Sequence, residues 1–384
     1  MDEQTPQQYQ HGHFVLLDQS RDKSFLINET VKYFIDKFSL PKTRTEVLQE
    51  IALDVKTDVP AIRKQCASFF SFLCRKKIVV PEDWTEPAVQ DEPFYKVGEI
   101  IGSFMVLEIL SSRKYVDIYL VGEENQLYVI KLLNPQKFSK KNKYEEELLV
   151  LKHEYDMLQK VKHIPFMCQA FSFQENAPPG AYIQLEYIKG DSLGQYLQQS
   201  QDLNETACYA IMGQMIQTFA LLHENNLIHG DIHPANILVR EDHSLKVIDL
   251  GLSLPQDVDQ QEVIKFGGVH CYMPPERINL SSVHKFSKEP DLYSDVYQIG
   301  LILYYILYLK EPFTGYIWEE LSENIKSNKI IFPEYSFRHF KVPEQLTVLI
   351  RKCTIKTRAK RYPSAAAVWN DFQTTMLNTQ VATT

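Results

Sequence analysis

The sequence has no hydrophobic run that could cross a bilayer, no secretory signal and no closely spaced cysteine pair. Its longest apolar run, Ile299–Leu309, is well short of the roughly 20 residues that a membrane-spanning helix needs. Met1–Gln10 is acidic and rich in glutamine, and it lacks the basic start and the apolar segment of a signal peptide. We therefore expect a cytoplasmic protein in which Ile299–Leu309 forms a buried helix.

The six cysteines are scattered at positions 66, 74, 168, 208, 271 and 353. None of them has the spacing of a zinc knuckle or of a redox motif. We expect buried, reduced thiols, as is usual in intracellular proteins.

The chain also has no excess of positive charge. Its net charge of −8 argues against non-specific binding to nucleic acid or to an anionic membrane, although it leaves room for a local basic patch. An apolar fraction of 44% and a charged fraction of 23% are typical of a soluble globular protein, and 384 residues are enough for two domains.

A segment rich in proline and acidic residues divides the sequence. Residues 81–97 contain three prolines and five acidic residues with little periodicity, which indicates a linker. We expect a small domain at residues 1–80, a larger domain at 98–376 and a short tail at 377–384.

The first domain has the pattern of a winged-helix-like module, with a strand pair, three helices and a closing strand. Thr43 and Glu46 have capping-box spacing before the second helix. The predicted elements are strands at Phe14–Leu17 and Ser24–Ile27, helices at Glu29–Phe38, at Thr45–Val55 and from about Asp58, and a strand at Ile78–Val80.

The larger domain begins with strands and continues with helices. We expect strands at Phe104–Leu110, Ile118–Val121, Gln126–Leu132 and Ala181–Tyr187, a helix at Lys141–Val161, and mainly helices beyond Ser192. This order predicts an α+β fold with two lobes, the first rich in β-structure and the second helical.

The strongest chemical signal is a pair of polar segments in the second lobe. The first is His229-Gly230-Asp231-Ile232-His233-Pro234-Ala235-Asn236, and the second is Ile248-Asp249-Leu250-Gly251. Phosphoryl transfer needs a base to orient the attacking hydroxyl, hard oxygen ligands for magnesium and positive charge on the phosphates. Asp231 can accept the hydroxyl proton, and Asn236 and Asp249 offer oxygen ligands suited to Mg²⁺.

In this order, the two segments resemble the catalytic loop and the metal-binding motif of the protein kinase superfamily. The resemblance implies a bilobal kinase fold, ATP and Mg²⁺ as cofactors, and Lys131 as the phosphate-binding lysine. Glu154 would be its helical partner, with Glu145, Glu146 and Glu147 as alternatives. Leu185 would be the gatekeeper beside adenine. The nucleotide pocket implied in this way is formed by Leu110, Ile118, Val129, Lys131, Leu185, Glu186, Ile188 and Leu238.

Further segments carry the same resemblance. Gly268–Glu276 is similar to the end of an activation segment, and Ser294-Asp295-Val296-Tyr297 opens an apolar helix as in protein kinases. The resemblance implies a buried structural ion pair between Glu276 and Arg361.

The sequence departs from the family pattern at the nucleotide loop. Ser111, Arg113 and Val116 stand where the family has three glycines. Glycine there permits positive dihedral angles and a close approach of backbone to phosphate. Two readings follow: a pseudokinase scaffold, or a different loop geometry in which Arg113 or Lys114 assists the phosphates.

Two other departures concern the acceptor. His233 replaces a lysine that is usual in serine/threonine kinases, and Val269 replaces a threonine. The pattern His-Gly-Asp-x-His-Pro-x-Asn is also similar to that of aminoglycoside and choline phosphotransferases, so a small-molecule hydroxyl kinase is an alternative. The resemblance gives His233 a role at the phosphate in either case.

The first domain resembles the winged-helix peptide-recognition domains typified by the peptide chaperone of pyrroloquinoline-quinone biosynthesis. Such domains bind the leader of a ribosomally made precursor peptide by strand addition. A docking module and a DNA-binding winged helix are the alternatives. Our expectation is a Ser/Thr-type kinase that phosphorylates a protein or peptide recruited by this domain, with no nucleic-acid partner.

Overall fold

The computed structural model describes residues 8–9, 13–18, 23–38, 42–75, 92–200, 203–256, 269–278, 288–314 and 318–382. The chain divides into two units, Met1–Ala88 and Val89–Thr384. The strand expected at 78–80, most of the expected linker, and Gly268 lie outside the described residues.

The first unit contains a three-stranded antiparallel sheet in the order β1-β2-β3. Strands β2 (His13–Asp18) and β3 (Lys23–Asn28) pair along their whole length, from His13 opposite Asn28 to Asp18 opposite Lys23. Both strands expected from the sequence are therefore present and slightly longer. A short strand that we did not expect, β1 (Gln8–Tyr9), pairs with the other side of β2.

Three helices follow in this unit: α1 (Glu29–Asp36), α2 (Arg44–Asp54) and α3 (Val59–Arg75). The expected capping box starts α2, because the Glu46 amide donates to Thr43 Oγ1 at 3.2 Å and the Thr43 amide donates to Glu46 Oε2 at 2.7 Å. Apolar side chains at helical spacing form the core, with the rings of Phe34 and Phe69 4.7 Å apart.

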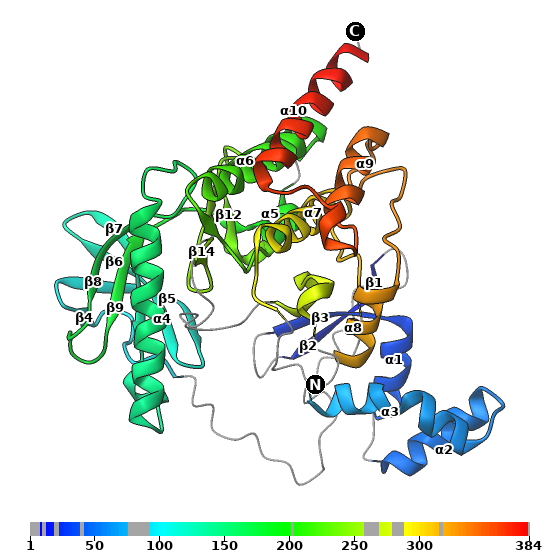
Figure 1. Ribbon diagram of the computed structural model, residues 1–384. Coiled ribbons are helices and arrows are strands. Elements are labelled where there is room, and N and C mark those ends of the chain that lie inside the picture. The colour runs from blue at the N-terminus through cyan, green and yellow to red at the C-terminus, as the bar shows by residue number, and fades with distance from the viewer. Residues whose placement is uncertain are drawn as a thin grey trace. The chain divides into compact units, whose positions relative to one another are not determined.

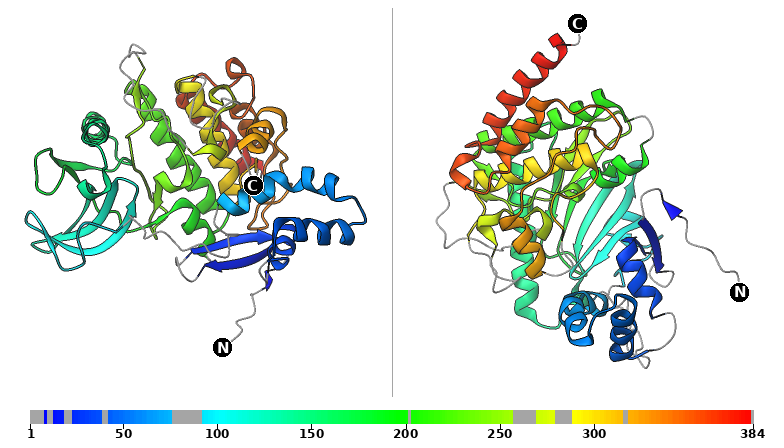
Figure 2. Two further views of the ribbon diagram at one scale, coloured as in Figure 1. Left: turned by 90° about the horizontal axis from the view of Figure 1, so that it is seen from below. Right: turned by 90° about the vertical axis from the view of Figure 1, so that its right-hand side faces the viewer.

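The second unit begins with a six-stranded sheet in the order β4-β5-β6-β7-β9-β8. Its strands are β4 (Ile100–Ile101), β5 (Phe104–Arg113), β6 (Val116–Glu123), β7 (Gln126–Leu133), β8 (Ala170–Gln174) and β9 (Tyr182–Glu186). Helix α4 (Lys141–Lys160) packs beside the sheet, and Figure 2 shows it end-on next to the curled strands. Leu151, Glu154 and Leu158 are buried because three- and four-residue spacing places them on one helical face.

The rest of the second unit is mainly helical (Figure 1). Its helices are α5 (Leu193–Gln199), α6 (Glu205–Glu224), α7 (Leu292–Tyr308), α8 (Trp318–Ser327), α9 (Glu344–Cys353) and α10 (Ala365–Ala382). From Ser294 onwards every residue of α7 is buried, so the longest apolar run is indeed a core helix. Within the described ranges, no helix is long and apolar enough to span a membrane.

Short antiparallel strands bring the two polar segments together. Strand β11 (Leu227–Ile228) pairs with β14 (Leu254–Pro255), while β10 (Asp191–Ser192), β12 (Ile237–Val239) and β13 (Leu245–Val247) form a second small sheet. Residues 229–236 connect β11 to β12, and residues 248–251 follow β13. Short 3₁₀ helices occur at η1 (Pro135–Lys137), η2 (Pro234–Asn236), η4 (His270–Tyr272), η5 (Pro275–Arg277) and η6 (Arg358–Lys360).

The ion pair expected between Glu276 and Arg361 is present and bidentate. Arg361 Nη1 and Nη2 each donate to one Glu276 carboxylate oxygen at 2.7 Å. The Arg361 side chain is fully buried and also donates to the carbonyl oxygens of Ile355 and Tyr293. The pair therefore joins η5 to the start of α7 and to the segment before α10.

Glu276→Gln tests the weight of this pair. Removing one partner of a buried ion pair leaves an uncompensated charge, so we expect a loss of about 3–5 kcal/mol in the free energy of unfolding. Urea unfolding of the full chain measures it. Glu334→Gln is the matched control, because Glu334 pairs with Lys341 on the surface at 3.1 Å, where both side chains are mostly exposed. Equal stability of the two variants would contradict the prediction.

Candidate active site

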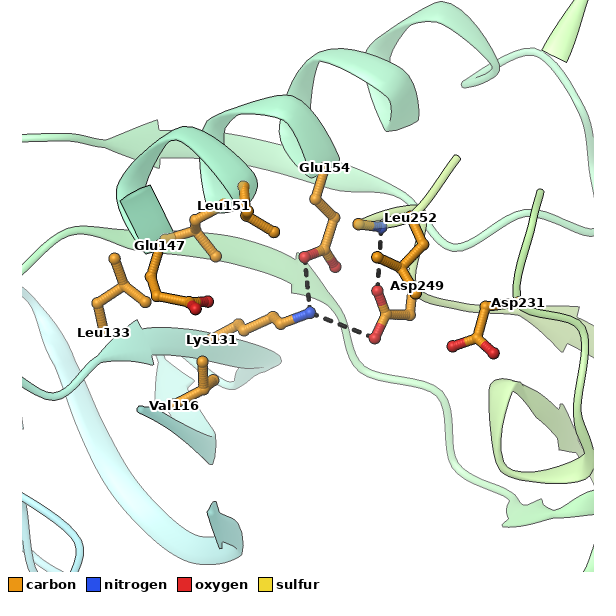
Figure 3. A pocket seen from close by; sticks show the side chains of 11 residues that line it. Val116, Lys131, Leu133, Glu147, Leu151, Glu154, Asp231, Asp249 and Leu252 are labelled. Carbon is orange, nitrogen blue, oxygen red and sulfur yellow. Dashed lines mark hydrogen bonds and ion pairs between the residues drawn. The ribbon is translucent and has the colours of Figure 1, made fainter. Parts of the chain in front are cut away.

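Lys131 lies between two carboxylates that come from distant parts of the chain. Its Nζ is 2.6 Å from Glu154 Oε2 on α4 and 3.5 Å from Asp249 Oδ2, which follows β13. Figure 3 shows the ammonium pointing between the two carboxylates, with Asp231 further along the same cavity. Of the candidate glutamates, Glu154 is the one that contacts Lys131, whereas Glu147 lies 3.1 Å from Lys143.

Burial and neighbouring charges act against each other in this cluster. The side chains of Lys131 and Glu154 are only 15% and 3% exposed. Burial disfavours the Lys131 ammonium, but Asp249 and Glu154 outweigh it and raise the pKa of Lys131. Burial raises the pKa of Glu154 to about 7 even though the Lys131 ammonium lowers it. The contact between Lys131 and Glu154 thus stabilises the charged form of each group against the cost of burial.

The loop that contains Asp231 is held through its backbone by buried side chains. Asp295, at the start of α7, accepts hydrogen bonds from the amides of His229 at 2.7 Å and Gly230 at 2.9 Å. Gln298 accepts from the Ile232 amide at 3.1 Å, and buried Arg277 donates to the Gly230 carbonyl at 3.1 Å. A loop has no ladder partners of its own, so these side chains satisfy its backbone groups.

Gly230 is required by its backbone conformation. Its φ is +77°, and a Cβ atom there would lie 2.8 Å from the carbonyl oxygen of Leu252. The loop therefore passes too close to the 248–252 segment for any larger residue to fit without movement.

Asp231 itself contacts the two positions at which the sequence departs from the family pattern. Its Oδ1 accepts from the Val269 amide at 3.2 Å, and its Oδ2 lies 3.5 Å from His233 Nε2. Asn236 Nδ2 donates to the Asp231 carbonyl at 3.1 Å, which fixes the orientation of its amide. The two sequence-predicted segments thus meet at one place, with Asp231, Asn236 and Asp249 near one another in the fold.

Next to this cluster is a cavity of about 460 Å³ between the sheet and the helical lobe. All eight residues expected to surround a nucleotide line it: Leu110, Ile118, Val129, Lys131, Leu185, Glu186, Ile188 and Leu238. Asp249 lies at its inner end together with Lys131 and Glu154. Cys168 is buried, as expected, and it also lines the cavity, which the sequence analysis did not predict.

The Glu186 side chain fixes the connection between the two lobes. The sequence analysis did not predict this role. Its carboxylate accepts from Lys246 Nζ at 2.9 Å, from Arg240 Nη2 at 3.2 Å and from the Gln169 amide at 3.2 Å. Both cations lie at the β12–β13 hairpin, 54 and 60 residues away in sequence. A contact at this separation leaves no local pattern in the sequence.

The oxygen ligands at the site fit magnesium in the way that nucleotide-dependent enzymes use it. Asp249 offers a hard oxygen ligand beside Lys131, and Asn236 offers a second one next to Asp231. Among the residues that the structure describes there is no group of three or more metal-ligating His, Cys, Asp or Glu side chains. Mg²⁺ is usually held by one or two carboxylates plus substrate phosphates rather than by a complete protein cage, so the arrangement suits a metal that arrives with a nucleotide.

The loop without glycines is a tight hairpin between β5 and β6. Arg113 pairs with Val116, and the turn between them is closed by Lys114, whose φ is +46°. Val116 lines a second cavity of about 240 Å³ together with Lys131, Glu154 and Asp231. Arg113 and Lys114 are exposed at the turn.

Comparisons with known proteins agree with this geometry. The model of the protein kinase domain matches residues 112–372. The chain is 30% identical over 281 residues to calcium-dependent protein kinase 6 of Plasmodium berghei, covering 71% of this chain and 17% of that protein. It is 26% identical over 247 residues to the serine/threonine-protein kinase cds1 of Schizosaccharomyces pombe, covering 64% and 51%. It is 29% identical over 200 residues to the probable serine/threonine-protein kinase PknB of Lactococcus lactis, covering 50% and 30%. The chain thus spans about half or less of the length of these curated relatives.

Gly230→Ala tests whether the close approach of the two segments positions Asp231. We expect a loss of about 1–3 kcal/mol in stability from the strained backbone, together with a fall in turnover because Asp231 shifts. Gly213→Ala in α6 is the control, since a Cβ there meets Phe372 at an ordinary 3.4 Å and alanine favours a helix. Thermal unfolding and turnover measure both effects, and wild-type turnover in Gly230→Ala would refute the assignment.

Proposed function

Because this chain belongs to the protein kinase family, we propose that it uses magnesium-bound ATP to phosphorylate serine or threonine hydroxyls of a protein or peptide. One observation carries the proposal: Lys131, Glu154 and Asp249 form a charged cluster at the inner end of the cavity that the eight predicted nucleotide residues line.

The family match confirms the coarser expectations from the sequence. The second unit has the bilobal kinase fold, with a curled sheet in the first lobe and helices in the second, and the chain is a serine/threonine protein kinase-like phosphotransferase. The relatives named above are protein kinases, which favours a protein acceptor over the small-molecule acceptor that the His-Gly-Asp segment left open. The residues to which we assign phosphate chemistry are all present, which favours activity over a pseudokinase scaffold. They are Lys131, Glu154, Asp231, Asn236 and Asp249.

In the proposed reaction, the Lys131 ammonium binds phosphate oxygens, and Glu154 fixes its direction. Asp231 orients the acceptor hydroxyl and takes its proton, while the hydroxyl oxygen forms a bond to the γ-phosphorus and the bond from that phosphorus to the bridging oxygen breaks. Asn236 and Asp249 would hold the magnesium ion, which neutralises charge on the phosphates when it is bound. The backbone groups of Glu186 and Ile188 would meet adenine beside Leu185.

The acceptor side of the site depends on His233 and Val269. His233 lies 3.5 Å from the Asp231 carboxylate, where it can donate to a phosphate oxygen in place of the usual lysine. The Val269 amide donates a hydrogen bond to Asp231 Oδ1. In our proposal the acceptor hydroxyl uses the oxygen of Asp231 on the His233 side.

For the first unit we propose a winged-helix-like fold that recruits the peptide substrate. A ribosomally made precursor peptide is one such substrate. The supporting observation is the sheet edge: within the described strands, β3 pairs with β2 alone. An extended peptide adds to such an edge through backbone hydrogen bonds. The expected division into residues 1–80, a linker at 81–97 and a catalytic domain at 98–376 belongs to this proposal.

The first test of the proposal is nucleotide binding. At 100-fold excess over Kd, a ligand stabilises the native state by about 2.7 kcal/mol, which is roughly 5–10 °C in Tm for a domain of this size. We expect Mg·ATP to produce such a shift in thermal unfolding, and Lys131→Met to remove it. Asp231→Asn is the control variant, because it should retain the shift while turnover collapses. Wild-type protein that shows no shift at millimolar Mg·ATP would contradict the proposal.

The second test concerns peptide recruitment. A peptide library is first screened for substrates of the full chain. KM and kcat for these peptides are then measured with the full chain and with a chain that lacks residues 1–90. Tethering supplies an effective concentration up to millimolar, so we expect KM for the recruited peptides to rise about 10²-fold while kcat for a generic acceptor is kept. Unchanged KM for every peptide would refute recruitment, and failure of the shortened chain to fold would make the first unit a structural partner.

A further inference from the structure

A fully buried carboxylate lies next to the turn of the β5–β6 hairpin, which contributes residues to the nucleotide cavity. Asp117 is the second residue of β6 and pairs with Ser112 across the hairpin. Its neighbour Ile118 faces the cavity, so the alternation of a strand directs Asp117 to the opposite face of the sheet. A buried charge is costly unless it is paired and hydrogen-bonded, and the surroundings of Asp117 meet that requirement fully.

Five donors from several segments converge on this carboxylate. Oδ1 accepts from Lys137 Nζ at 2.6 Å and from Ser112 Oγ at 2.7 Å. Oδ2 accepts from Asn134 Nδ2 at 2.8 Å and from Tyr119 Oη and the Phe94 amide, both at 2.9 Å. Burial opposes the charge, but these donors, led by Lys137, outweigh it and lower the pKa of Asp117.

The turn of the hairpin is attached to the same connection. The Asn134 amide donates to the carbonyl oxygen of Tyr115 at 3.0 Å. The Tyr115 ring stacks on Phe138 with centroids 4.7 Å apart and planes 16° apart. The connection between β7 and α4 contains Asn134, Lys137 and Phe138. The turn of the hairpin and the strand residues next to it are therefore fixed to the segment that leads into α4, the helix that carries Glu154.

The segment before the sheet, residues 92–95, also contacts this cluster. Besides the Phe94 amide, the Tyr95 amide donates to Tyr119 Oη at 3.0 Å, and Asn134 Nδ2 donates to the Glu92 carbonyl at 3.3 Å. Residues 92–95 are the first described residues after the segment that follows the first unit. The path of the chain entering the kinase domain is thus tied to the nucleotide hairpin.

β6 is held in the sheet by its pairing with β7, whereas residues 108–113 of β5 pair with β6 alone among the described strands. The loop between β5 and β6 also lacks the glycines that would let its backbone follow a phosphate. We infer that Asp117 is a positioning residue for the nucleotide: through Lys137, Asn134 and Phe94 it holds the β5–β6 hairpin in one place over the cavity and couples that place to α4. The inference rests on the proposed function in that the cavity must bind ATP.

The decisive comparison is between Asp117→Asn and Val121→Ala in the full chain. Val121 is fully buried on the same face of β6 as Asp117 and packs in the core that contains Tyr119, so Val121→Ala lowers stability while it leaves the five donors to the Asp117 carboxylate in place. For Asp117→Asn we expect faster hydrogen exchange of amides 111–118 and a rise of roughly tenfold in KM for ATP, with a smaller change in kcat. Val121→Ala should leave both the exchange of the hairpin and the KM unchanged.

Tyr115→Ala provides a second variant that is safe for folding, because Tyr115 is only partly buried and loses its stacking on Phe138. It should shift exchange and KM in the same direction as Asp117→Asn. The inference is overturned if hairpin exchange in both variants equals that of wild type, or if KM for ATP rises no more than in Val121→Ala. A wild-type chain that does not bind Mg·ATP would refute the proposed function instead, and the exchange measurement would still decide whether Asp117 fixes the hairpin.

Discussion

One ammonium group, that of Lys131, determines how the separate parts of this site meet. It comes from β7, and its two carboxylate partners come from α4 and from the segment after β13. In a largely buried setting, an ammonium that lost one carboxylate would remain as an uncompensated charge. The sheet, the helix and the 248–251 segment are therefore constrained together, and a displacement of any one of them weakens at least one of the two contacts.

The same principle is repeated around the site, where buried or half-buried carboxylates hold loops and hairpins. Asp295 binds two amides of the 229–236 loop, Glu186 binds the cations of the β12–β13 hairpin, and Asp117 binds five donors around the β5–β6 hairpin. Loops cannot satisfy their backbone groups through ladders, so a buried acceptor with several donors defines their path. Lys131 and Glu154 are placed by regular elements, whereas the loop of Asp231 is placed by the acceptor beside it.

Much of this arrangement was predictable, because local patterns report local structure. The resemblance to the protein kinase superfamily paired Lys131 with Glu154, and the structure brings these two side chains into contact. The capping-box spacing of Thr43 and Glu46 predicted the start of α2. The strands β1 and β8 were missed: β1 is two residues long, and β8 at the sheet edge carries the exposed Phe171. Short or edge strands have too few buried positions to show a period. The roles of Asp117, Glu186 and Arg277 were also missed, since their partners are set by the paths of distant segments rather than by neighbours in sequence.

The hydrogen bonds from Asp295 to the His229 and Gly230 amides have a consequence for the synthesis of the protein. The ribosome completes every residue that we assign to phosphate chemistry by Asp249, but the acceptor that shapes their loop appears 46 residues later, at position 295. At roughly 5–20 residues per second, a nascent chain carries the whole set for several seconds without a means to arrange it. A nascent chain that ends before Asp295 therefore contains both polar segments but lacks the carboxylate that holds the His229 and Gly230 amides.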